Sequence, residues 1–410
     1  KRWTGAGTFK YYWYTPNYTD GSHNVTVWAN DTAGNTNSTY YEFIVDNTEP
    51  TVSINTPSDG EYISSSDVTV SWTGDDNIAV DHYEVSLDGG SWINVGMNTS
   101  HTFTGLSDGD HNVTVMVVDK AGNANFDIVI FTVDTSSPTV TITSPSSGSW
   151  TNIKNVTITW SANDSGSGID HYEVRCYNST WDSGWINVGL NTSYTFTNLG
   201  DDQYTVQVAA YDKAGNTGSD QITVGVDTKA PQITITEPPD YINTTTATVS
   251  WTWSDSSGID HFEVLLKNET WNSSWIDVGT STSHSFQNLS EGTYTVYVKG
   301  VDLAGNIGIA SKKFIVDLTA PTVTISSPAD GSWLNVYEFN VTWSASDDRE
   351  LGRYNVTLDG SEVDSGLIDG TSFSKNTTIN VSSDGDYNIT VRVWDEAGNP
   401  GSASIIVHID

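Results

Sequence analysis

The sequence predicts an all-β fold, a tandem array of seven-stranded antiparallel β-sandwiches. The motif Asp-x-Ala-Gly-Asn occurs five times, and its copies start 88, 93, 90 and 93 residues apart. A fixed period of this size indicates one structural unit copied in tandem. Between the motifs, apolar and polar residues alternate in short runs that are typical of half-buried strands, and no run has the spacing of an amphipathic helix. Function must therefore be sought in an array as well as in any single site.

The boundaries between repeats share one pattern: Val-Asp, three linking residues, then Pro followed by alternating apolar residues. The linkers are short and end in Pro, so neighbouring modules should be held close with limited swing. The predicted modules are residues 1–46, 47–134, 135–227, 228–317 and 318–410. The first aligns with only the second half of the others. We therefore expect the chain to be part of a longer protein, and we expect another chain or an upstream segment to complete that module.

Residues 135–227 illustrate the strands expected in each complete module. Trp160 stands on the second predicted strand and recurs as Trp72, Trp251 and Trp343. Seven strands in about ninety residues, separated by turn residues, are typical of an antiparallel sandwich. The expected strands are 139–143, 156–160, 171–174, 185–189, 194–199, 204–208 and 222–226.

Two sets of residues carry a resemblance to known families. The Trp of the second strand, Tyr-x-Val on the third, and Tyr294-Thr-Val-Tyr-Val before a Gly turn resemble fibronectin type III modules. The Val-Asp-x-x-x-Pro junctions and the Asp-x-Ala-Gly-Asn turn resemble the tandem immunoglobulin-like repeats of bacterial and archaeal surface proteins. The resemblance implies a sandwich fold for the whole chain and says little about function. Because His23 and His111 replace a Tyr of the other copies, a hydroxyl-anchored corner is not expected there.

Composition excludes several classes of function. Asp and Glu number 51 against 16 Lys and Arg, giving a net charge of −35, which argues against binding nucleic acid or anionic lipid and favours cation binding or a salty medium. No signal peptide, membrane-spanning run or lipidation motif is visible. The single Cys176 stands where sibling repeats have Leu, so we expect a buried apolar residue, with a reactive thiol as the alternative.

The recurring Asp residues support two interpretations, which the sequence leaves open. In the first, the Asp and Asn of each motif only hydrogen-bond the turn, and its Gly adopts a positive φ. In the second, three carboxylates converge at each junction and bind structural Ca²⁺, because the loops that carry them share one pole of the sandwich. The candidate ligands are Asp46, Asp76 and Asp119; Asp134, Asp164 and Asp212; Asp227, Asp255 and Asp302; and Asp317, Asp347 and Asp395.

The chain carries nineteen Asn-x-Ser/Thr sequons, where chance would give about nine. We expect N-linked glycans on an extracellular surface, and many glycans without disulfides fit an archaeal surface better than an animal one. The candidate sites are Asn17, Asn24, Asn30, Asn37, Asn98, Asn112, Asn155, Asn163, Asn178, Asn191, Asn243, Asn268, Asn272, Asn288, Asn340, Asn355, Asn376, Asn380 and Asn388.

No catalytic triad, paired catalytic carboxylate, zinc-protease motif or phosphate loop stands out, so no enzymatic activity and no catalytic cofactor are expected. His82, His171 and His261 recur singly and are expected at the surface. We predict a non-enzymatic, extracellular structural protein that self-associates into a cell-surface filament, stalk or layer. The alternatives are an adhesin that binds a ligand or carbohydrate through exposed aromatic residues, and the non-catalytic stalk of a secreted enzyme.

Overall fold

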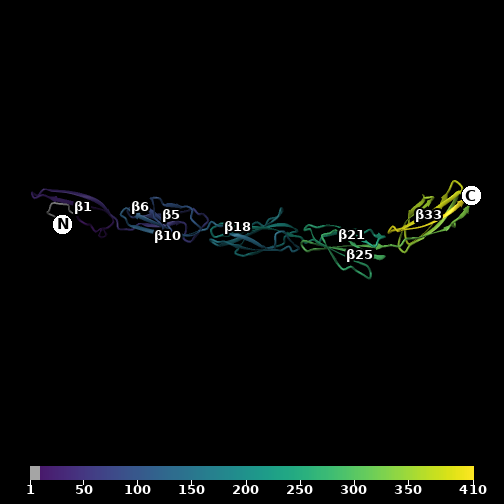
Figure 1. Ribbon diagram of the computed structural model, residues 1–410. Helices are drawn as coiled ribbons and strands as arrows, with labels where there is room; N and C mark the ends of the chain where they lie inside the picture. The colour runs from purple at the N-terminus through teal and green to yellow at the C-terminus, as the bar shows by residue number, and fades with distance from the viewer. Residues whose placement is uncertain (1–9) are drawn as a thin grey trace. The chain divides into compact units, whose positions relative to one another are not determined.

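A computed structural model describes residues 10–410, so residues 1–9 of the first predicted module lie outside it (Figure 1). The prediction of an all-β fold is confirmed. Apart from one 3-10 turn, Thr15–Asn17, every regular element in the described part of the chain is a strand. The chain divides into two compact units: residues up to 147 with 157–196 and 204–223, and residues 148–156, 197–203 and 224–410.

Each of the four complete repeats consists of a three-stranded and a five-stranded sheet. In the second repeat the three-stranded sheet has the order β3 (Thr51–Thr56), β5 (Val68–Asp75), β8 (Ser100–Phe103). The five-stranded sheet has the order β4 (Glu61–Ile63), β10 (Ala124–Val133), β9 (Gly109–Asp119), β6 (Val80–Leu87), β7 (Ile93–Gly96). The third has β11 (Thr139–Ser144), β13 (Val156–Asn163), β16 (Ser193–Phe196), and β12 (Ser149–Thr151), β18 (Thr217–Val226), β17 (Asp202–Asp212), β14 (Ile169–Tyr177), β15 (Ile186–Gly189).

The last two repeats have the same strand order. The fourth has β19 (Gln232–Glu237), β21 (Ala247–Ser254), β24 (Ser283–Phe286), and β20 (Tyr241–Ile242), β26 (Ile307–Val316), β25 (Gly292–Asp302), β22 (Ile259–Lys267), β23 (Ile276–Gly279). The fifth has β27 (Thr322–Ser327), β29 (Glu338–Ser346), β32 (Ser372–Asn380), and β28 (Ser332–Leu334), β34 (Pro400–Ile409), β33 (Gly385–Asp395), β30 (Leu351–Leu358), β31 (Ser361–Leu367).

The structure thus adds a strand to the seven expected from the pattern. The first strand of each repeat ends at a cis X-Pro bond, and the chain then contributes a strand of two or three residues to the other sheet, where it pairs in parallel with the last strand. In the second repeat this is β4 against β10, with Tyr62 opposite Thr132. A strand this short carries too few residues to show an alternation, which is why the sequence did not predict it.

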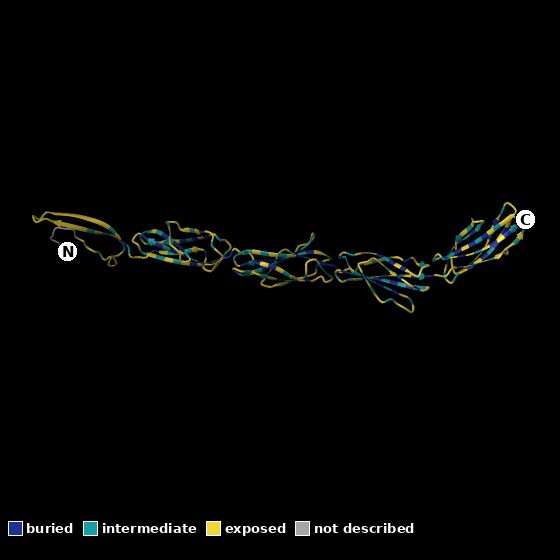
Figure 2. Cartoon of the chain, viewed as in Figure 1, coloured by how far each residue is buried: buried dark blue, intermediate teal, exposed yellow. Residues whose placement is uncertain are grey.

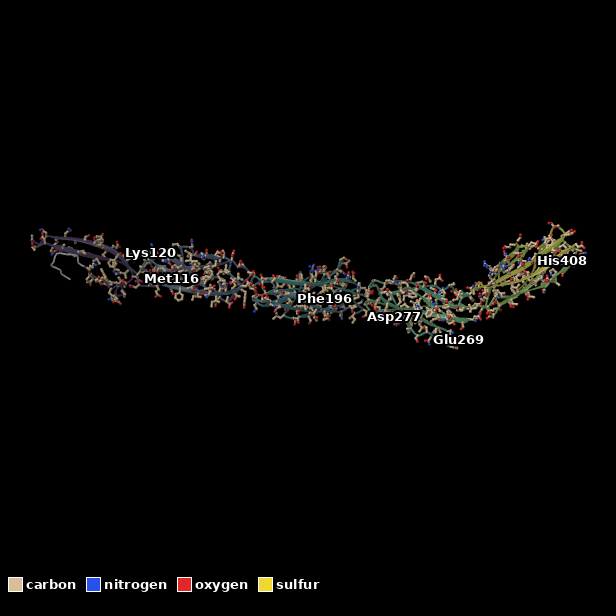
Figure 3. All side chains as sticks on the ribbon, in the orientation of Figure 1. Met116, Lys120, Phe196, Glu269, Asp277 and His408 are labelled. Atoms are coloured by element: carbon tan, nitrogen blue, oxygen red, sulfur yellow. The ribbon has the colours of Figure 1, made fainter. Side chains whose placement is uncertain are left out.

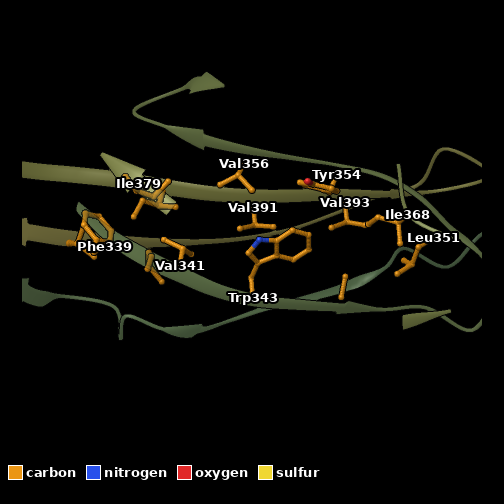
Figure 4. Packing of buried hydrophobic residues seen from close by; sticks show 14 of the residues in the cluster. Phe339, Val341, Trp343, Leu351, Tyr354, Val356, Ile368, Ile379, Val391 and Val393 are labelled. Atoms are coloured by element: carbon orange, nitrogen blue, oxygen red, sulfur yellow. The ribbon is translucent and has the colours of Figure 1, made fainter. Parts of the chain in front are cut away.

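The core of each repeat lies between its two sheets. In the fifth repeat the Trp343 ring is fully buried among Val341, Val391 and Val393, and its centroid lies 5.0 Å from that of Tyr354 (Figure 4). These residues alternate with outward-facing polar ones along β29 and β33. Fully burying one such apolar side chain contributes about 1.5–3 kcal/mol, so the clustered cores of the second, fourth and fifth repeats are major contributors to folding.

The last strand of a repeat packs closely against the Pro that begins it. A Cβ atom at Gly308, near the start of β26, would lie 2.0 Å from the carbonyl oxygen of Pro231. Gly218 and Gly401 stand in the same relation to Pro138 and Pro321, at 1.7 and 1.9 Å. Only glycine leaves room for this approach.

The first repeat is a two-stranded hairpin, β1 (Gly21–Asn30) with β2 (Thr36–Val45), and much of it is exposed (Figure 2). The indole of Trp13 packs edge-on against Phe43, with ring centroids 4.7 Å apart. Other apolar residues stay in water: Val27 is 52% exposed, whereas Val115 at the equivalent place in β9 is 0% exposed. The hairpin therefore has the residues of a core without the strands that would cover it.

The turn that leads into β9, β25 or β33 is stabilised by a hydrogen bond from a His or Tyr side chain near the start of that strand to the backbone carbonyl four residues earlier. Tyr294 Oη donates to Ser290 O at 3.1 Å. His111 Nε2 makes the equivalent bond to Ser107 O at 2.9 Å, so this corner is anchored without a hydroxyl. The other ring nitrogen, Nδ1, lies 2.8 Å from an oxygen of Asp88. Since a carbonyl and a carboxylate only accept, both contacts are satisfied when both ring nitrogens donate, and this geometry therefore favours the charged imidazole.

We expect the second repeat to lose stability as pH rises past neutrality. Burial opposes the charge of His111, but its bonds to Ser107 and Asp88 outweigh burial and raise its pKa. A raised folded pKa contributes stability that is fully present below the unfolded value, about 6.5, and is lost as pH rises through the folded pKa. The loss should be at most about 1 kcal/mol, the value of a partly exposed ion pair.

The measurement is the urea midpoint of the second repeat between pH 5 and 8.5, compared with His111→Tyr. The tyrosine keeps the bond to Ser107 without a titrating charge, so the difference between the two proteins should shrink or reverse as pH rises. A difference that does not change with pH would contradict the role of the His111 charge.

Candidate metal centres

Twelve Asp residues form four groups of three, in the combinations predicted from the sequence. Within each group, one oxygen from each carboxylate lies within 4.8 Å of the other two. The first Asp follows the last strand of a repeat, the second follows β5, β13, β21 or β29, and the third ends β9, β17, β25 or β33. The groups are Asp46, Asp76 and Asp119; Asp134, Asp164 and Asp212; Asp227, Asp255 and Asp302; and Asp317, Asp347 and Asp395.

In three of the four groups the junction Asp is held by both repeats through its backbone. The N–H of Asp134 donates to Ile63 O of the second repeat at 2.9 Å. Its carbonyl accepts from Asn216 Nδ2 of the third repeat at 2.8 Å. The same two bonds recur at Asp227 and Asp317. The junction residue is therefore fixed before its carboxylate binds anything.

This role of the motif Asn was not predicted. The sequence interpretation gave Asn216 only a turn bond, although the residue recurs in all five copies as Asn35, Asn123, Asn216, Asn306 and Asn399. The presence of Asn in every copy could have indicated this second bond, because a turn needs Gly and a capping Asp but does not need Asn as its last residue.

The turn bonds of the first interpretation are also made. Asp212 Oδ1 accepts from the Asn216 backbone N–H and Oδ2 from its side-chain amide, both at 2.8 Å. The motif glycine Gly215 has φ 93°, in the left-handed region. Turn formation explains the third Asp of each group by itself. The second Asp also bonds N–H groups of its own loop, as Asp164 Oδ2 accepts from Gly166 and Gly168 at 3.1 and 2.7 Å. Turn bonds alone do not require the three carboxylates to lie within 4.8 Å of one another.

A second set of acids, also not predicted, holds the linkers. Asp108, before β9, accepts from the N–H and hydroxyl of Thr135 at 3.0 and 2.8 Å and from the hydroxyl of Ser136 at 2.9 Å. Asp20, Asp201 and Glu291 accept from linker residues in the same way. An acidic residue recurs three residues before the His or Tyr of each corner, and this recurrence could have indicated the set.

Several carboxylate oxygens in the groups have no hydrogen-bond partner although solvent hardly reaches them. These are Asp76 Oδ1, Asp164 Oδ1, Asp317 Oδ2 and Asp347 Oδ2. Asp317 is only 1% exposed. In the described residues, no Lys, Arg or His forms an ion pair with any of the twelve. Two charges 4.8 Å apart repel by about 3.5 kcal/mol at an effective dielectric constant of about 20, so a bound cation or proton would relieve this repulsion in each group.

The junctions differ in how far the protein itself compensates this charge. Burial alone would raise the pKa of Asp134, but hydrogen bonds from the side chain and N–H of Ser167 and from the N–H of Ser136 outweigh it and lower the pKa. Asp317 has no such serine, because the loop after β29 reads Asp347-Asp-Arg-Glu where the third repeat has Asp164-Ser-Gly-Ser. Burial, followed by the carboxylates of Asp395 and Asp347, raises the pKa of Asp317 to about 6.

The donor set fits a hard divalent cation. Carboxylate and carbonyl oxygens are the ligands of Ca²⁺, which takes about six to eight of them in a flexible geometry. Each group offers three carboxylates without nitrogen or sulfur donors, which does not suit zinc. The unpartnered buried oxygens of Asp317 and Asp347 are the observation that points to a ligand. Ca²⁺ binding itself remains a prediction.

The remaining predicted residues lie apart from these groups. All nineteen sequon asparagines are exposed or half-buried. His82, His171 and His261 each pair with the Asp before them and form no metal cluster within residues 10–410. Cys176 is fully buried, and burial raises the pKa of its thiol to about 12. In the described part, no helix is long and apolar enough to cross a lipid bilayer.

A family model for the bacterial Ig domain matches residues 50–115, 138–224 and 321–391. Residues 228–317, outside these matches, form the same pair of sheets. Among curated proteins, exoglucanase B of Cellulomonas fimi is 29% identical over 73% of this chain and 28% of its own length. Halomucin of Haloquadratum walsbyi is 27% identical over 87% of this chain and 3% of its own length. The chain therefore spans less than a third of either relative.

Solved structures include the fibronectin(III)-like modules of CbhA from Clostridium thermocellum. They are 21% identical, with a TM-score of 0.32, over 43% of this chain and 94% of that one. A tetra-tandem repeat from the extending region of a large adhesion protein is also 21% identical, with a TM-score of 0.31, over 88% of this chain and 99% of that one.

Proposed function

This chain belongs to the bacterial Ig domain family, as its sequence predicted, and from that premise we propose that it is a non-enzymatic, extracellular structural protein. Its tandem modules form a filament, stalk or layer at a cell surface. Calcium ions at the junctions stiffen the array. The proposed localisation rests on the sequons, the acidic surface and the nature of the family.

One observation carries this proposal: at three of the four junctions the Asp is bonded by its backbone to the repeats on both sides, and at all four its carboxylate joins two others from the following repeat. Bound calcium would offset two of the three negative charges and bridge the carboxylates. In the fourth group, Asp317, Asp347 and Asp395 would hold it. The backbone bonds to Ile242 and Asn399 keep Asp317 in place. The test is the melting temperature and the particle length in solution, each measured with calcium and with a chelator.

We also propose that the array carries N-linked glycans on its sheet faces. Asn24 and Asn388 are exposed and Asn112 is half-buried at one position of three different repeats, on the side of the strand that faces away from the core. A glycan there requires no rearrangement of the core. Peptide mass spectrometry of the protein from its own host should find glycan-bearing peptides at several of the nineteen sequons. Unmodified asparagine at all of them would refute this part.

Self-association is proposed from the β1–β2 hairpin. Val27, Trp28 and Tyr41 are more than half exposed, and apart from β2 no strand of the described chain pairs with β1. An open, apolar edge of this kind is a template for strand addition. Strands of another subunit, completing the sandwich, would join chains end to end.

A second candidate is the non-catalytic stalk of a secreted hydrolase. The similarity to exoglucanase B and, at 31% identity over 54% of this chain, to chitinase A1 of Niallia circulans favours it. In both proposed functions the modules act as a spacer. In the second, the spacer is joined to a catalytic domain, and in the first it is not. A hydrolase domain in the complete gene would decide for the second.

A further inference from the structure

The third and fourth repeats each carry a loop that holds two tryptophans in water. The loops are residues 178–185, between β14 and β15, and residues 268–275, between β22 and β23; Glu269, labelled in Figure 3, lies on the second. Their Trp side chains are 41–49% exposed, at Trp181, Trp185, Trp271 and Trp275. So large an apolar surface in contact with water is costly and marks an interaction site when it gathers in one place.

Both loops are firmly built and have the same conformation. Asn178 Oδ1 accepts from the N–H groups of Thr180 and Trp181 at 2.9 and 2.7 Å. Asn268 makes the same bonds in the fourth repeat, at 3.0 and 2.8 Å. A serine hydroxyl then accepts from the core strand, Ser183 from Cys176 N–H in one repeat and Ser273 from Leu266 N–H in the other. The tryptophans are therefore held in position by the loops.

The loop of the fourth repeat keeps this conformation although one of its residues, Ser274, must adopt an unfavourable backbone angle. Ser274 has φ 60°, a left-handed conformation that is costly for a residue with a Cβ, and Gly184 at the same place of the third repeat has φ 65°. The fourth repeat thus retains the geometry without the glycine that favours it. The loop shape is specified by its other contacts.

Polar and charged groups lie beside one exposed tryptophan of each loop, Trp185 in the third repeat and Trp275 in the fourth. In the fourth repeat a shallow groove is lined by Leu265, Lys267, Asn272, Trp275 and Tyr297. Lys267 Nζ lies 4.9 Å from the centre of the Tyr297 ring, and Lys299 Nζ lies 5.2 Å from that of Trp275.

The third repeat has an equivalent arrangement. The Arg175 guanidinium lies 4.8 Å from the centre of the Tyr177 ring and 5.9 Å from that of Trp185. Both surfaces therefore combine partly exposed aromatic rings with charged groups that lie over some of those rings.

This combination matches a carbohydrate better than a protein or a polyanion. The axial C–H groups of a pyranose pack on an aromatic face, while its hydroxyls bond to polar groups at the edge. A protein partner would meet an apolar centre depleted of charge, which is not present here. Acidic polymers are disfavoured because the net charge is −35 and two of the three nearby cations already form ion pairs, Arg175 with Asp182 and Lys299 with Glu263.

We propose that these two loops bind a neutral polysaccharide, with pyranose rings stacked on Trp181 and Trp185 in the third repeat and on Trp271 and Trp275 in the fourth. The repetition suits a polymer, because one ligand chain offers many identical rings. The second repeat keeps a single Trp92 at this place, and the fifth has no aromatic residue between Asp359 and Leu367. Binding therefore resides in two repeats of the array. It goes beyond the structural role and does not depend on calcium.

The test is affinity electrophoresis of the full chain, produced without glycans, through gels containing hydroxyethyl cellulose or glycol chitin. At least one of these neutral polymers should retard the protein, with little effect of sodium chloride. Replacing all four tryptophans by alanine should weaken retardation at least tenfold, and replacing only Trp271 and Trp275 should weaken it partly. The matched control is Trp333→Ala, because Trp333 is 70% exposed in the fifth repeat and lies outside both loops.

Several outcomes would overturn the proposal. They are no retardation in either neutral gel, equal retardation of the double Trp271→Ala, Trp275→Ala variant and the parent chain, and retardation only by alginate that salt abolishes. Asn178 and Asn268 are themselves sequons, so glycans there would occupy the rings. If the polymer retards the unglycosylated chain but not the protein from its own host, the loop tryptophans would be covered by the chain's own glycans and would not bind a separate polysaccharide. Retardation that persists with a chelator separates this proposal from the junction sites.

Discussion

Calcium is expected to raise the melting temperature of the chain by about 10 °C or more over its value in a chelator. A ligand that binds only the folded state at a hundred times its Kd contributes about 2.7 kcal/mol per site. In a domain of this size, 1 kcal/mol shifts the melting temperature by about 4–8 °C. The effect is large because three carboxylates within 4.8 Å of one another, with no basic partner, repel one another until a cation offsets most of their charge.

The junction before the fifth repeat should depend most on calcium. Asp134 and Asp227 each accept an N–H from a serine of the next repeat, at 2.6 and 3.1 Å, whereas Asp317 Oδ2 has no partner. Calorimetry should therefore show the largest shift in the transition of the fifth repeat, and chelation should also change the particle length.

A pair of matched variants in the third repeat separates the site from general charge effects. Asp164→Asn removes a charge from the group and should abolish the calcium response of that repeat. Asp170→Asn removes the same charge from an exposed Asp that pairs with His171, and should leave the response intact. If chelation changes neither melting temperature nor particle length, the carboxylate groups serve only the turns.

Trp251→Ala is expected to destabilise the fourth repeat by about 3–5 kcal/mol, the usual cost of truncating a large buried aromatic side chain. Trp251 is 3% exposed and packs edge-on against Phe262, with ring centroids 5.5 Å apart. The second, fourth and fifth repeats have separate hydrophobic cores. The loss should therefore appear in one unfolding transition in urea, and the others should keep their midpoints.

The same strand supplies the control. Trp253 also lies on β21 but is 40% exposed, so Trp253→Ala should cost clearly less, about 1 kcal/mol. Equal losses for the two variants would mean that the core is not where the alternation of β21 places it. A joint shift of all transitions would mean that the repeats do not unfold independently.

The sequence predicted the sandwich well because alternation along long strands is a strong signal. Alternation placed Trp72, Trp160, Trp251 and Trp343 inside, and all four are buried. The short strand after each cis X-Pro bond was missed because two or three residues show no period. The His111 corner was doubted because only a hydroxyl was considered, although an imidazole N–H reaches the same carbonyl.

The carboxylate groups were predictable because loop Asp residues at fixed offsets from a strand fall at the same pole in every copy. Their unequal compensation was not. It depends on whether a serine N–H happens to face the junction carboxylate, as Ser167 faces Asp134 and no residue does for Asp317 Oδ2. Such a difference of one hydrogen bond comes from the three-dimensional path of a loop, which single residues do not reveal.

The two-sided attachment of the junction Asp has a consequence for how such an array can change its length. The backbone of Asp134 completes the second repeat, because its N–H bonds to Ile63 of that repeat. Its carboxylate, however, lies with Asp164 and Asp212 of the third repeat. Each group of carboxylates therefore uses the last residue of one repeat and two residues of the next. Removing or inserting one whole period of about ninety residues still leaves three carboxylates and one amide at every junction. Recombination between repeats can therefore lengthen or shorten the array without creating an interface that has not already been selected.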